Sequence, residues 1–286
     1  MAKPIYGEPM IISELIKSAA KKLQDVGIDT ARLDAMLLLE TALGKNRSYL
    51  VANSEAAVSE NAQKQFAILL KRRINREPIS QIIGKKEFYG RQFKVSKDVL
   101  TPRPETEFII EVALKLFNKN SEINILDLGT GSGCIILTLL AEMPNAKGVG
   151  VDKSKSALAI AAKNAYDLKI ENVEFVHSDW CKNLESQQKF HLIVSNPPYI
   201  PKTEQKTLDA ELDFEPETAL FGGDDGLDCY RLIAKEISGL KFDFAILEIG
   251  INQEGEVKKI FEQYQIKHKE TLADLAGIPR VIVFNK

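Results

Sequence analysis

The second half of the chain alternates short apolar runs with longer segments of helical pattern. From Ile123 onward the runs are INILDLG, KGVGVD, VEFVHSD, FHLIVSNPP and FDFAILEIG. Strands that alternate with helices form a parallel sheet, because each helix carries the chain back across the sheet to start the next strand. Two later runs, IKHKETLADL and PRVIVFN, lie close together and predict an antiparallel hairpin added to this sheet. We therefore predict an α/β fold here.

The first part of the chain has a different apolar period. Between residues 11 and 75 the apolar residues recur at helical spacing, as in Ile12, Leu15, Ile16 and Ala19. Asp29-Thr30 offers a capping residue for a helix that begins with ARLDAM, and Gly44 is placed to end it. We predict several consecutive helices and no strand in this stretch.

The 286 residues suit two domains joined by a short connection. Residues 77–100 contain β-type runs around Gly90, which predicts a hairpin. We therefore predict a helical domain over 1–76, a β-hairpin linker over 77–100 and an α/β domain over 101–286. The helical domain carries no recognisable chemistry, so we expect it to dock a partner.

Composition narrows the classes of partner. The chain has 38 basic and 40 acidic residues, a net charge of -2, which argues against a nucleic-acid partner. Its three cysteines are widely spaced, so we predict neither a disulfide framework nor a metal site. No apolar run approaches the roughly 20 residues that span a bilayer, and the N-terminal residues lack a signal-peptide pattern. We expect a cytoplasmic protein that does not contact a membrane.

A glycine-rich turn follows the first of the α/β runs. A turn of this kind lets the backbone approach a ligand and exposes N–H groups at the start of the next helix. The spacing is GxGxG, and Cys134 stands where a dinucleotide fingerprint has its last glycine, which favours S-adenosylmethionine over a nicotinamide cofactor. Alternatively, the glycines make only a tight turn. The predicted cofactor-binding residues of this turn are Gly129, Thr130, Gly131, Ser132 and Gly133.

Two later strand ends offer groups for the adenosyl part of such a cofactor. Asp152 ends the second run, where a carboxylate can accept hydrogen bonds from both ribose hydroxyls. Its alternative role is to cap the helix that begins near Ser154. Asp179 and Trp180 follow the third run, where the indole can stack on the adenine and the carboxylate can accept from its amine. A packing tryptophan is the alternative.

The motif Asn196-Pro197-Pro198-Tyr199 directly follows the fourth run and is the most specific short motif in the chain. Two prolines stiffen the turn and fix the direction of its carbonyl groups. The Asn196 side-chain carbonyl and the Pro197 backbone carbonyl can each accept one hydrogen of a planar NH2 group, which aligns its nitrogen for methylation. We expect Tyr199 to lie against the flat face of the substrate. A rigid loop is the alternative.

With both motifs in this order, the sequence resembles the release-factor glutamine methyltransferase family over nearly the whole chain. Other stretches that match are TPRPETE at 101–107, the loop from Phe214 to Leu227, and DLAGIPR at 274–280. The resemblance implies a class I S-adenosylmethionine-dependent methyltransferase with a Rossmann-like, seven-stranded sheet and a small N-terminal helical bundle. It also implies that TPRPETE lies near the site; alternatively, that stretch is only a proline-rich turn.

The resemblance further implies the substrate and the residue roles. The substrate would be the glutamine of a Gly-Gly-Gln tripeptide in bacterial-type peptide chain release factors, methylated on its side-chain nitrogen with S-adenosylhomocysteine as coproduct. Residues 129–133, Asp152, Trp180 and Asn196 would bind the cofactor, and Asn196 to Tyr199 would bind the glutamine. The helical domain would hold the release factor.

Two other functions stay open. A DNA or RNA methyltransferase acting on exocyclic amines would orient the same planar NH2 group, but it needs a basic surface for its substrate. A non-catalytic protein that binds S-adenosylmethionine or a partner is the second alternative.

Overall fold

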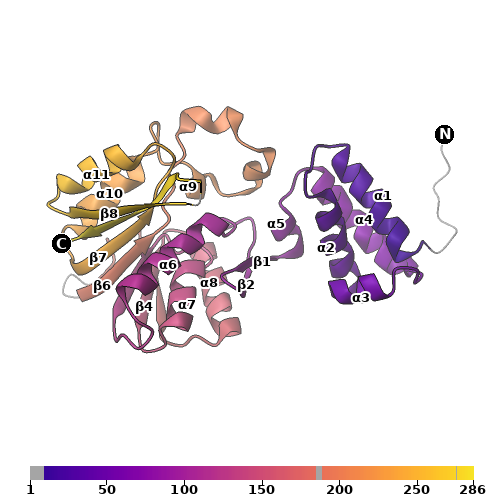
Figure 1. Cartoon of the computed structure of the whole chain (residues 1–286), viewed down its shortest axis with the longest axis horizontal. Coiled ribbons are helices and arrows are strands. Elements are labelled where there is room, and N and C mark those ends of the chain that lie inside the picture. Colours follow the sequence, from indigo (N-terminus) through magenta and orange to yellow (C-terminus); the bar gives the residue numbers. More distant parts are fainter. Residues whose placement is uncertain (1–9, 185–188, 275) are drawn as a thin grey trace. The chain divides into compact units, whose positions relative to one another are not determined.

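The structure is a computed structural model that describes residues 10–184, 189–274 and 276–286. The chain forms two compact units, Met1–Gly84 and Lys85–Lys286, each with its own core (Figure 1).

The first unit is helical in its described part, as the apolar spacing predicted. Leu15, Leu38 and Phe66 lie in its core, together with other apolar residues from the same faces. Gly44 ends the second helix in a left-handed conformation, as predicted. Thr30 is the N-cap residue of that helix, but its side chain makes no capping hydrogen bond within the described residues. The helices are α1 (Ile12–Gln24), α2 (Ala31–Leu43), α3 (Arg47–Ala52), α4 (Glu60–Ile74) and α5 (Ile79–Ile83).

A buried ion pair joins two of these helices. Nε of Arg73 on α4 donates to Oδ2 of Asp34 on α2 over 2.7 Å, and both side chains are almost inaccessible to solvent. Because a buried charge without its partner is costly, this pair fixes how α2 packs on α4.

The second unit is built on a seven-stranded sheet with the order β5-β4-β3-β6-β7-β9-β8. The strands from β5 to β7 are parallel, and β9 runs antiparallel to both β7 and β8. The predicted parallel sheet with a terminal antiparallel hairpin is therefore confirmed. The strands are β3 (Asn124–Leu128), β4 (Lys147–Asp152), β5 (Val173–His177), β6 (Lys189–Ser195), β7 (Lys241–Glu248), β8 (Lys267–Ala273) and β9 (Pro279–Asn285).

Helices cover both faces of this sheet. Ile125 on β3 packs into the core with α6 and α7, whereas its neighbour Leu126 packs into the core with α10 and α11. This alternation follows from the two-residue period of a strand. Figure 1 shows α6, α7 and α8 on one side of the sheet and α10 and α11 on the other. These helices are α6 (Glu107–Leu116), α7 (Cys134–Glu142), α8 (Lys155–Leu168), α10 (Asp228–Ile237) and α11 (Glu254–Glu262).

Shorter elements complete the unit. Three of those in the described residues are 3-10 helices, and a four-residue helix, α9, ends directly before Phe221, which forms a β-bridge with Ile200. These elements are η1 (Pro104–Thr106), η2 (Lys202–Thr207), η3 (Ala210–Phe214) and α9 (Glu217–Leu220).

The predicted hairpin forms, but the predicted linker is not a separate unit. Strands β1 (Lys85–Phe88) and β2 (Arg91–Lys94) pair antiparallel around Gly90. Phe88 and Phe93 are buried in the core that contains α6 and α7, so the hairpin belongs to the second unit. Residues 77–84 belong to the first unit, which ends at Gly84 instead of the expected residue 76.

Candidate active site

The candidate site lies along one edge of the parallel strands. The glycine turn follows β3, Asp152 ends β4, Trp180 comes soon after β5, and Asn196 directly follows β6. Parallel strands end at the same edge, and ligands bind there where the strand order reverses. The order reverses at β3, because the chain passes from β3 to β4 on one side and returns to β6 on the other.

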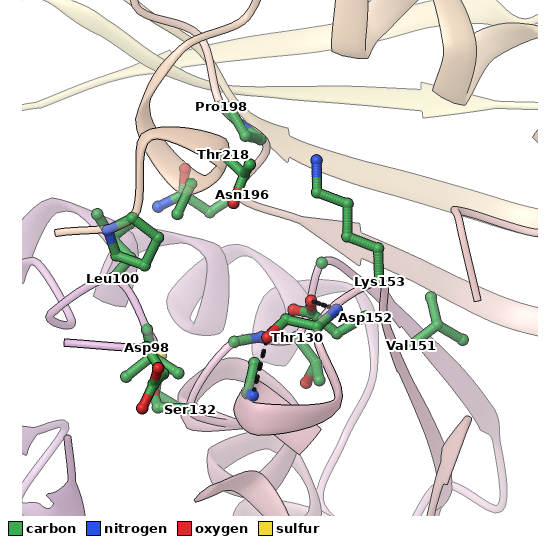
Figure 2. A pocket seen from close by; sticks show the side chains of 18 of the residues that line it. Asp98, Leu100, Thr130, Ser132, Val151, Asp152, Lys153, Asn196, Pro198 and Thr218 are labelled. Atoms are coloured by element: carbon green, nitrogen blue, oxygen red, sulfur yellow. Dashed lines mark hydrogen bonds between the residues drawn. The ribbon is translucent and has the colours of Figure 1, made fainter. Parts of the chain in front are cut away.

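A cavity of about 280 Å³ brings most of the predicted residues together. Figure 2 shows two groups that line it, with Thr130 and Asp152 below and Asn196 and Pro198 above. Gly133, Pro197 and Tyr199 are not among the described residues that line the cavity. The predicted residues that line it are Gly129, Thr130, Gly131, Ser132, Asp152, Trp180, Asn196 and Pro198.

The glycine turn is shaped by positive φ angles at all three glycines: +74° at Gly129, +55° at Gly131 and +79° at Gly133. The N–H groups of Gly129 and Thr130 both donate to the Val151 carbonyl over 2.9 Å, which ties the turn to β4. A Cβ atom at Gly133 would lie only 3.2 Å from Cβ of Ala161 on α8, so glycine there permits close helix packing.

Asp127 supports this turn from beneath. Its carboxyl is fully buried and accepts a 2.7 Å hydrogen bond from the Thr130 hydroxyl. Burial raises the pKa of Asp127 to about 7, although the Thr130 hydrogen bond opposes this shift. The buried carboxyl therefore fixes the Thr130 side chain at the floor of the cavity.

Asp152 holds the same turn from the side. Its Oδ2 accepts from the Gly131 N–H over 2.9 Å, and its Oδ1 accepts from the Ser154 N–H over 2.8 Å. Ser154, not Asp152, caps α8, because its hydroxyl accepts from the Ala157 N–H. A carboxylate oxygen can accept more than one hydrogen bond. Asp152 can therefore hold the turn and still accept from a ligand.

Trp180 forms another wall of the cavity. It is partly buried and has a φ of +54°. Its Cζ3 atom lies 3.8 Å from the position that a Cβ atom on Gly129 would take. Asp179 also lines the cavity, is exposed, and pairs with Lys182. An apolar ring beside an opened backbone turn is a suitable surface for a flat ligand.

Side chains from distant segments fix the NPPY turn. Ser195, the last residue of β6, is buried and donates from its hydroxyl to the Leu128 carbonyl over 2.7 Å, which ties the ends of β6 and β3 together. Nδ2 of Asn196 donates to the Thr106 hydroxyl over 2.9 Å. Asn196 is therefore positioned by its side chain as well as by the proline-stiffened backbone.

Tyr199 turns toward the end of β7. Its hydroxyl donates to Oε1 of Glu248 over 3.1 Å, and burial together with this carboxylate raises the pKa of Tyr199. The hydroxyl thus has a partner inside the protein. Contact between Tyr199 and the substrate stays a prediction.

Glu248 was missed by sequence reasoning. Its side chain is buried and accepts a 2.7 Å hydrogen bond from the Thr106 hydroxyl as well as the bond from Tyr199. Burial raises the pKa of Glu248 to about 7 against the opposing effect of these two bonds. A signal was present, since FDFAILEIG places one acidic residue at the end of an apolar strand.

Another ion pair lies at the cavity wall. Arg103 lines the cavity and donates to Oε2 of Glu215 over 2.7 Å, and the Glu215 side chain is buried. The pair joins the TPRPETE stretch to the acidic loop, which also contributes Pro216, Thr218 and Ala219 to the cavity. The expectation that TPRPETE lies near the site is confirmed.

The residues fit S-adenosylmethionine. A Cβ atom on Gly129 or Gly131 would meet no protein atom closer than 3.8 Å, so the turn leaves space against its backbone. Asp152 retains acceptor capacity for hydroxyl groups, and Trp180 offers a flat apolar face. The cavity therefore combines groups for the polar and aromatic parts of such a cofactor.

Comparison with known proteins gives the family. A protein-family model described as PrmC N-terminal domain matches residues 14–84, and one described as Methyltransferase small domain matches residues 107–214. The release factor glutamine methyltransferase of Caulobacter vibrioides is 42% identical over 274 residues, which cover 93% of this chain and 93% of that protein. The chain belongs to the release factor glutamine methyltransferase family. A second release factor glutamine methyltransferase, from Coxiella burnetii, is 38% identical over 95% of this chain and 98% of its own.

Solved structures agree with the fold of this release factor glutamine methyltransferase family member. The hMettl16 catalytic domain in complex with MAT2A 3'UTR hairpin 1 matches with a TM-score of 0.59 and 12% identity, covering 83% of this chain and 90% of that one. A methyltransferase from Pyrococcus furiosus has a TM-score of 0.52 and 16% identity, with 79% and 98% covered. At these identities the likeness shows the fold alone.

The expectations about fold class and cofactor are therefore confirmed. The second unit is an S-adenosylmethionine-dependent methyltransferase domain with a seven-stranded sheet. Within the described residues, the structure contains no helix with the length and apolar character needed to span a bilayer.

Proposed function

We propose that this protein transfers a methyl group from S-adenosylmethionine to the side-chain amide nitrogen of the glutamine in the Gly-Gly-Gln tripeptide of a peptide chain release factor. The observation that carries the proposal is the Asn196 side chain at the cavity wall. Its Nδ2 is engaged by Thr106, which leaves Oδ1 to accept from a substrate NH2 group. Membership of the family supports the choice of glutamine.

S-adenosylmethionine supplies an electrophilic methyl group on a sulfonium. The new bond joins this carbon to the amide nitrogen, the carbon–sulfur bond breaks with its electron pair staying on sulfur, and the nitrogen loses one proton. The products are an N-methylated amide, S-adenosylhomocysteine and a proton.

The protein contributes mainly by positioning. We assign the backbone of residues 129–132, Asp152 and Trp180 to the cofactor, because they line one side of the cavity with an open turn, a carboxylate and an aromatic face. We assign Asn196 Oδ1 and the Pro197 carbonyl to the two hydrogens of the glutamine amide. Holding both hydrogens orients the nitrogen toward the methyl donor, and such orientation supplies a large part of the rate enhancement in two-substrate reactions.

The helical unit has the separate role of docking the release factor. Residues 14–84 match the PrmC N-terminal domain, and the unit exposes large apolar side chains such as Val51 and Ile68, 68% and 56% accessible. The balanced charge of the chain argues against a nucleic-acid substrate, and a release factor places the reaction in the cytoplasm.

A transfer assay with radiolabelled methyl groups tests this proposal. The protein is incubated with labelled S-adenosylmethionine and a purified release factor, the same factor with the tripeptide glutamine replaced by alanine, or total RNA. We expect label in the first sample only. Label in RNA but not in the release factor would replace the proposal with nucleic-acid methylation.

A further inference from the structure

Four side chains form one hydrogen-bonded series beside the cavity. Asn196 Nδ2 donates to Thr106 Oγ1 over 2.9 Å, and Thr106 Oγ1 donates to Glu248 Oε2 over 2.7 Å. The Tyr199 hydroxyl donates to the other Glu248 oxygen, Oε1, over 3.1 Å. The series therefore joins both ends of the NPPY turn to one carboxyl group at the end of β7.

The donors and acceptors in this series fix the orientation of the Asn196 amide. A hydroxyl has one hydrogen, and the Thr106 hydrogen is directed at the Glu248 carboxylate. Thr106 must then accept from Asn196, so the NH2 side of that amide faces Thr106. Its oxygen is the side that remains for a substrate N–H group.

We propose that Glu248 is a positioning residue for methyl transfer: its carboxylate, acting through Thr106, holds the Asn196 amide with its oxygen presented to the substrate nitrogen. This inference rests on the proposed function, because it assigns the hydrogen-bond acceptor that orients the glutamine. Glu248 itself touches neither the substrate nor the cofactor in this account.

The burial of Glu248 needs a functional explanation. Its side chain is only 2% accessible, and burying a carboxylate costs free energy unless it is fully paired. The nearby charged and titratable groups only partly compensate. Arg280 lowers the pKa of Glu248 and Glu105 raises it, and Tyr199, Tyr230 and Cys134 also interact with it electrostatically. Thr106 and Tyr199 both donate to Glu248, and a carboxylate has an acceptor oxygen for each of them. A neutral residue would not serve equally well in this position.

Protonation of Glu248 would reverse the series. The carboxyl O–H could then donate to Thr106, which would free the Thr106 hydrogen to donate to Asn196. The Asn196 amide could turn over and present its NH2 group to the substrate, where a donor faces a donor. Because the pKa of Glu248 is raised to about 7, this change falls in an accessible pH range.

The first test is the pH dependence of kcat for release-factor methylation at saturating S-adenosylmethionine. In the wild type we expect kcat to rise with pH through about pH 7, where Glu248 loses its proton. In Glu248→Gln we expect a kcat lower by about tenfold or more, without this rise. Thr106 and Tyr199 both donate to Glu248, but a carboxamide has only one acceptor oxygen. One of these two hydroxyl groups must therefore accept from the new NH2 group instead. A wild-type kcat with an unchanged rise in Glu248→Gln would overturn the proposal.

Two comparisons assign the effect to this carboxyl group. Asp127 also has a pKa of about 7, but it remains in Glu248→Gln, so a rise that persists belongs to Asp127 and contradicts the proposal. Glu105→Gln is the matched control, because Glu105 raises the pKa of Glu248 without a hydrogen bond to it among the described contacts. We expect Glu105→Gln to keep the maximal kcat and to shift the rise to lower pH.

Substitutions at Thr106 test the middle of the series. Thr106→Val keeps the shape and removes the hydroxyl, and we expect kcat to fall by about tenfold or more with the Kd for S-adenosylmethionine within about twofold of wild type. Thr106→Ser restores the hydroxyl and should restore most of the kcat. Equal losses in both variants, with both folded by circular dichroism, would show that packing and not the hydroxyl matters, and would contradict the proposal.

A measurement without turnover separates this inference from the proposed function. Selective ¹⁵N-asparagine labelling allows the Asn196 side-chain amide to be followed by NMR, assigned by its loss in Asn196→Ala. We expect its resonance to titrate near pH 7 in the wild type and not in Glu248→Gln. A wild type that shows this titration but leaves the release factor unmodified would remove the proposed function only. An amide that does not titrate, in an active wild type, would remove the Glu248 inference only.

Discussion

The two sides of the cavity are held in different ways. On the cofactor side, the glycine turn is fixed by backbone bonds to the adjacent strand and by Asp152, which lies 21 residues from Gly131. On the substrate side, Asn196 is fixed by Thr106, which lies 90 residues from it in the sequence, and Thr106 is fixed by Glu248, which lies 142 residues from Thr106. The first arrangement follows from a short motif, whereas the second exists only once the sheet has brought distant segments together.

The two turns also differ in the groups that satisfy their hydrogen bonds. In the glycine turn, the N–H groups of Gly129 and Thr130 donate to the Val151 carbonyl and the N–H of Gly131 donates to Asp152, so β4 satisfies these three backbone groups. Both sides contain a buried carboxyl whose pKa burial raises to about 7. Asp127 holds only the Thr130 side chain of the glycine turn, whereas Glu248 holds both ends of the NPPY turn, through Thr106 and Tyr199. We expect the two sides to respond differently to mutation: the cofactor side through affinity, and the substrate side through turnover.

Asn196→Ala should give the largest effect. It removes the acceptor for the substrate nitrogen, so kcat should fall on the order of 10²-fold or more, while the Kd for S-adenosylmethionine changes little. Steady-state kinetics and calorimetric titration measure the two quantities. Asn145→Ala, at an exposed position on the same unit, is the control and should behave as wild type. An Asn196→Ala protein with normal kcat would remove Asn196 from the substrate side.

Asp152→Ala should give the opposite pattern. It removes a carboxylate that holds the glycine turn and is assigned to the ribose, so the Kd should rise by about 10- to 10²-fold. At saturating cofactor, kcat should recover to near the wild-type value. Asp152→Asn retains one acceptor oxygen, so its Kd should lie between those of the wild type and Asp152→Ala. If Asp152→Ala binds the cofactor normally, Asp152 serves only the turn.

Tyr199→Phe should have a moderate effect on turnover. It keeps the ring and removes the bond to Glu248, so kcat at pH 7 should fall by about tenfold. Loss of a donor to the carboxylate raises the Glu248 pKa further, so the loss of kcat should shrink at higher pH. A uniform loss at all pH values would instead indicate direct contact between the Tyr199 hydroxyl and the substrate.

Trp180→Phe should have the smallest effect. A smaller aromatic face stacks less well, so the Kd for S-adenosylmethionine should rise by about threefold with kcat unchanged. Trp180 is the only tryptophan in the chain, so quenching of its fluorescence reports cofactor binding directly in the wild type. A lower melting temperature with an unchanged Kd, measured by calorimetry, would identify Trp180 as a packing residue.

Local patterns predicted much of the molecule. The alternation of apolar runs gave the parallel sheet, and the two closely spaced runs gave the β8–β9 pair. Gly129 and Asp152, each at the end of a strand, were predicted to bind the same cofactor, and the resemblance added Asn196; all three line the cavity. These predictions rest on geometry that every parallel sheet shares.

Other features required long-range contacts. The hairpin at Gly90 was visible, but its membership of the second unit depends on Phe88 and Phe93 reaching the core with α6. Thr106 and Glu248 carry no local signal of contact, since 142 residues separate them. The orientation of Tyr199 toward Glu248 depends on the same folded neighbourhood.

Fragmentation mass spectrometry of a purified release factor, incubated with this protein and S-adenosylmethionine, determines directly whether this protein methylates the Gly-Gly-Gln glutamine. We expect the mass of one added methyl group on the side chain of the Gly-Gly-Gln glutamine, and an unmodified factor with Asn196→Ala under the same conditions. An unmodified glutamine in the wild-type reaction, with the cofactor shown to bind, would contradict the proposed function.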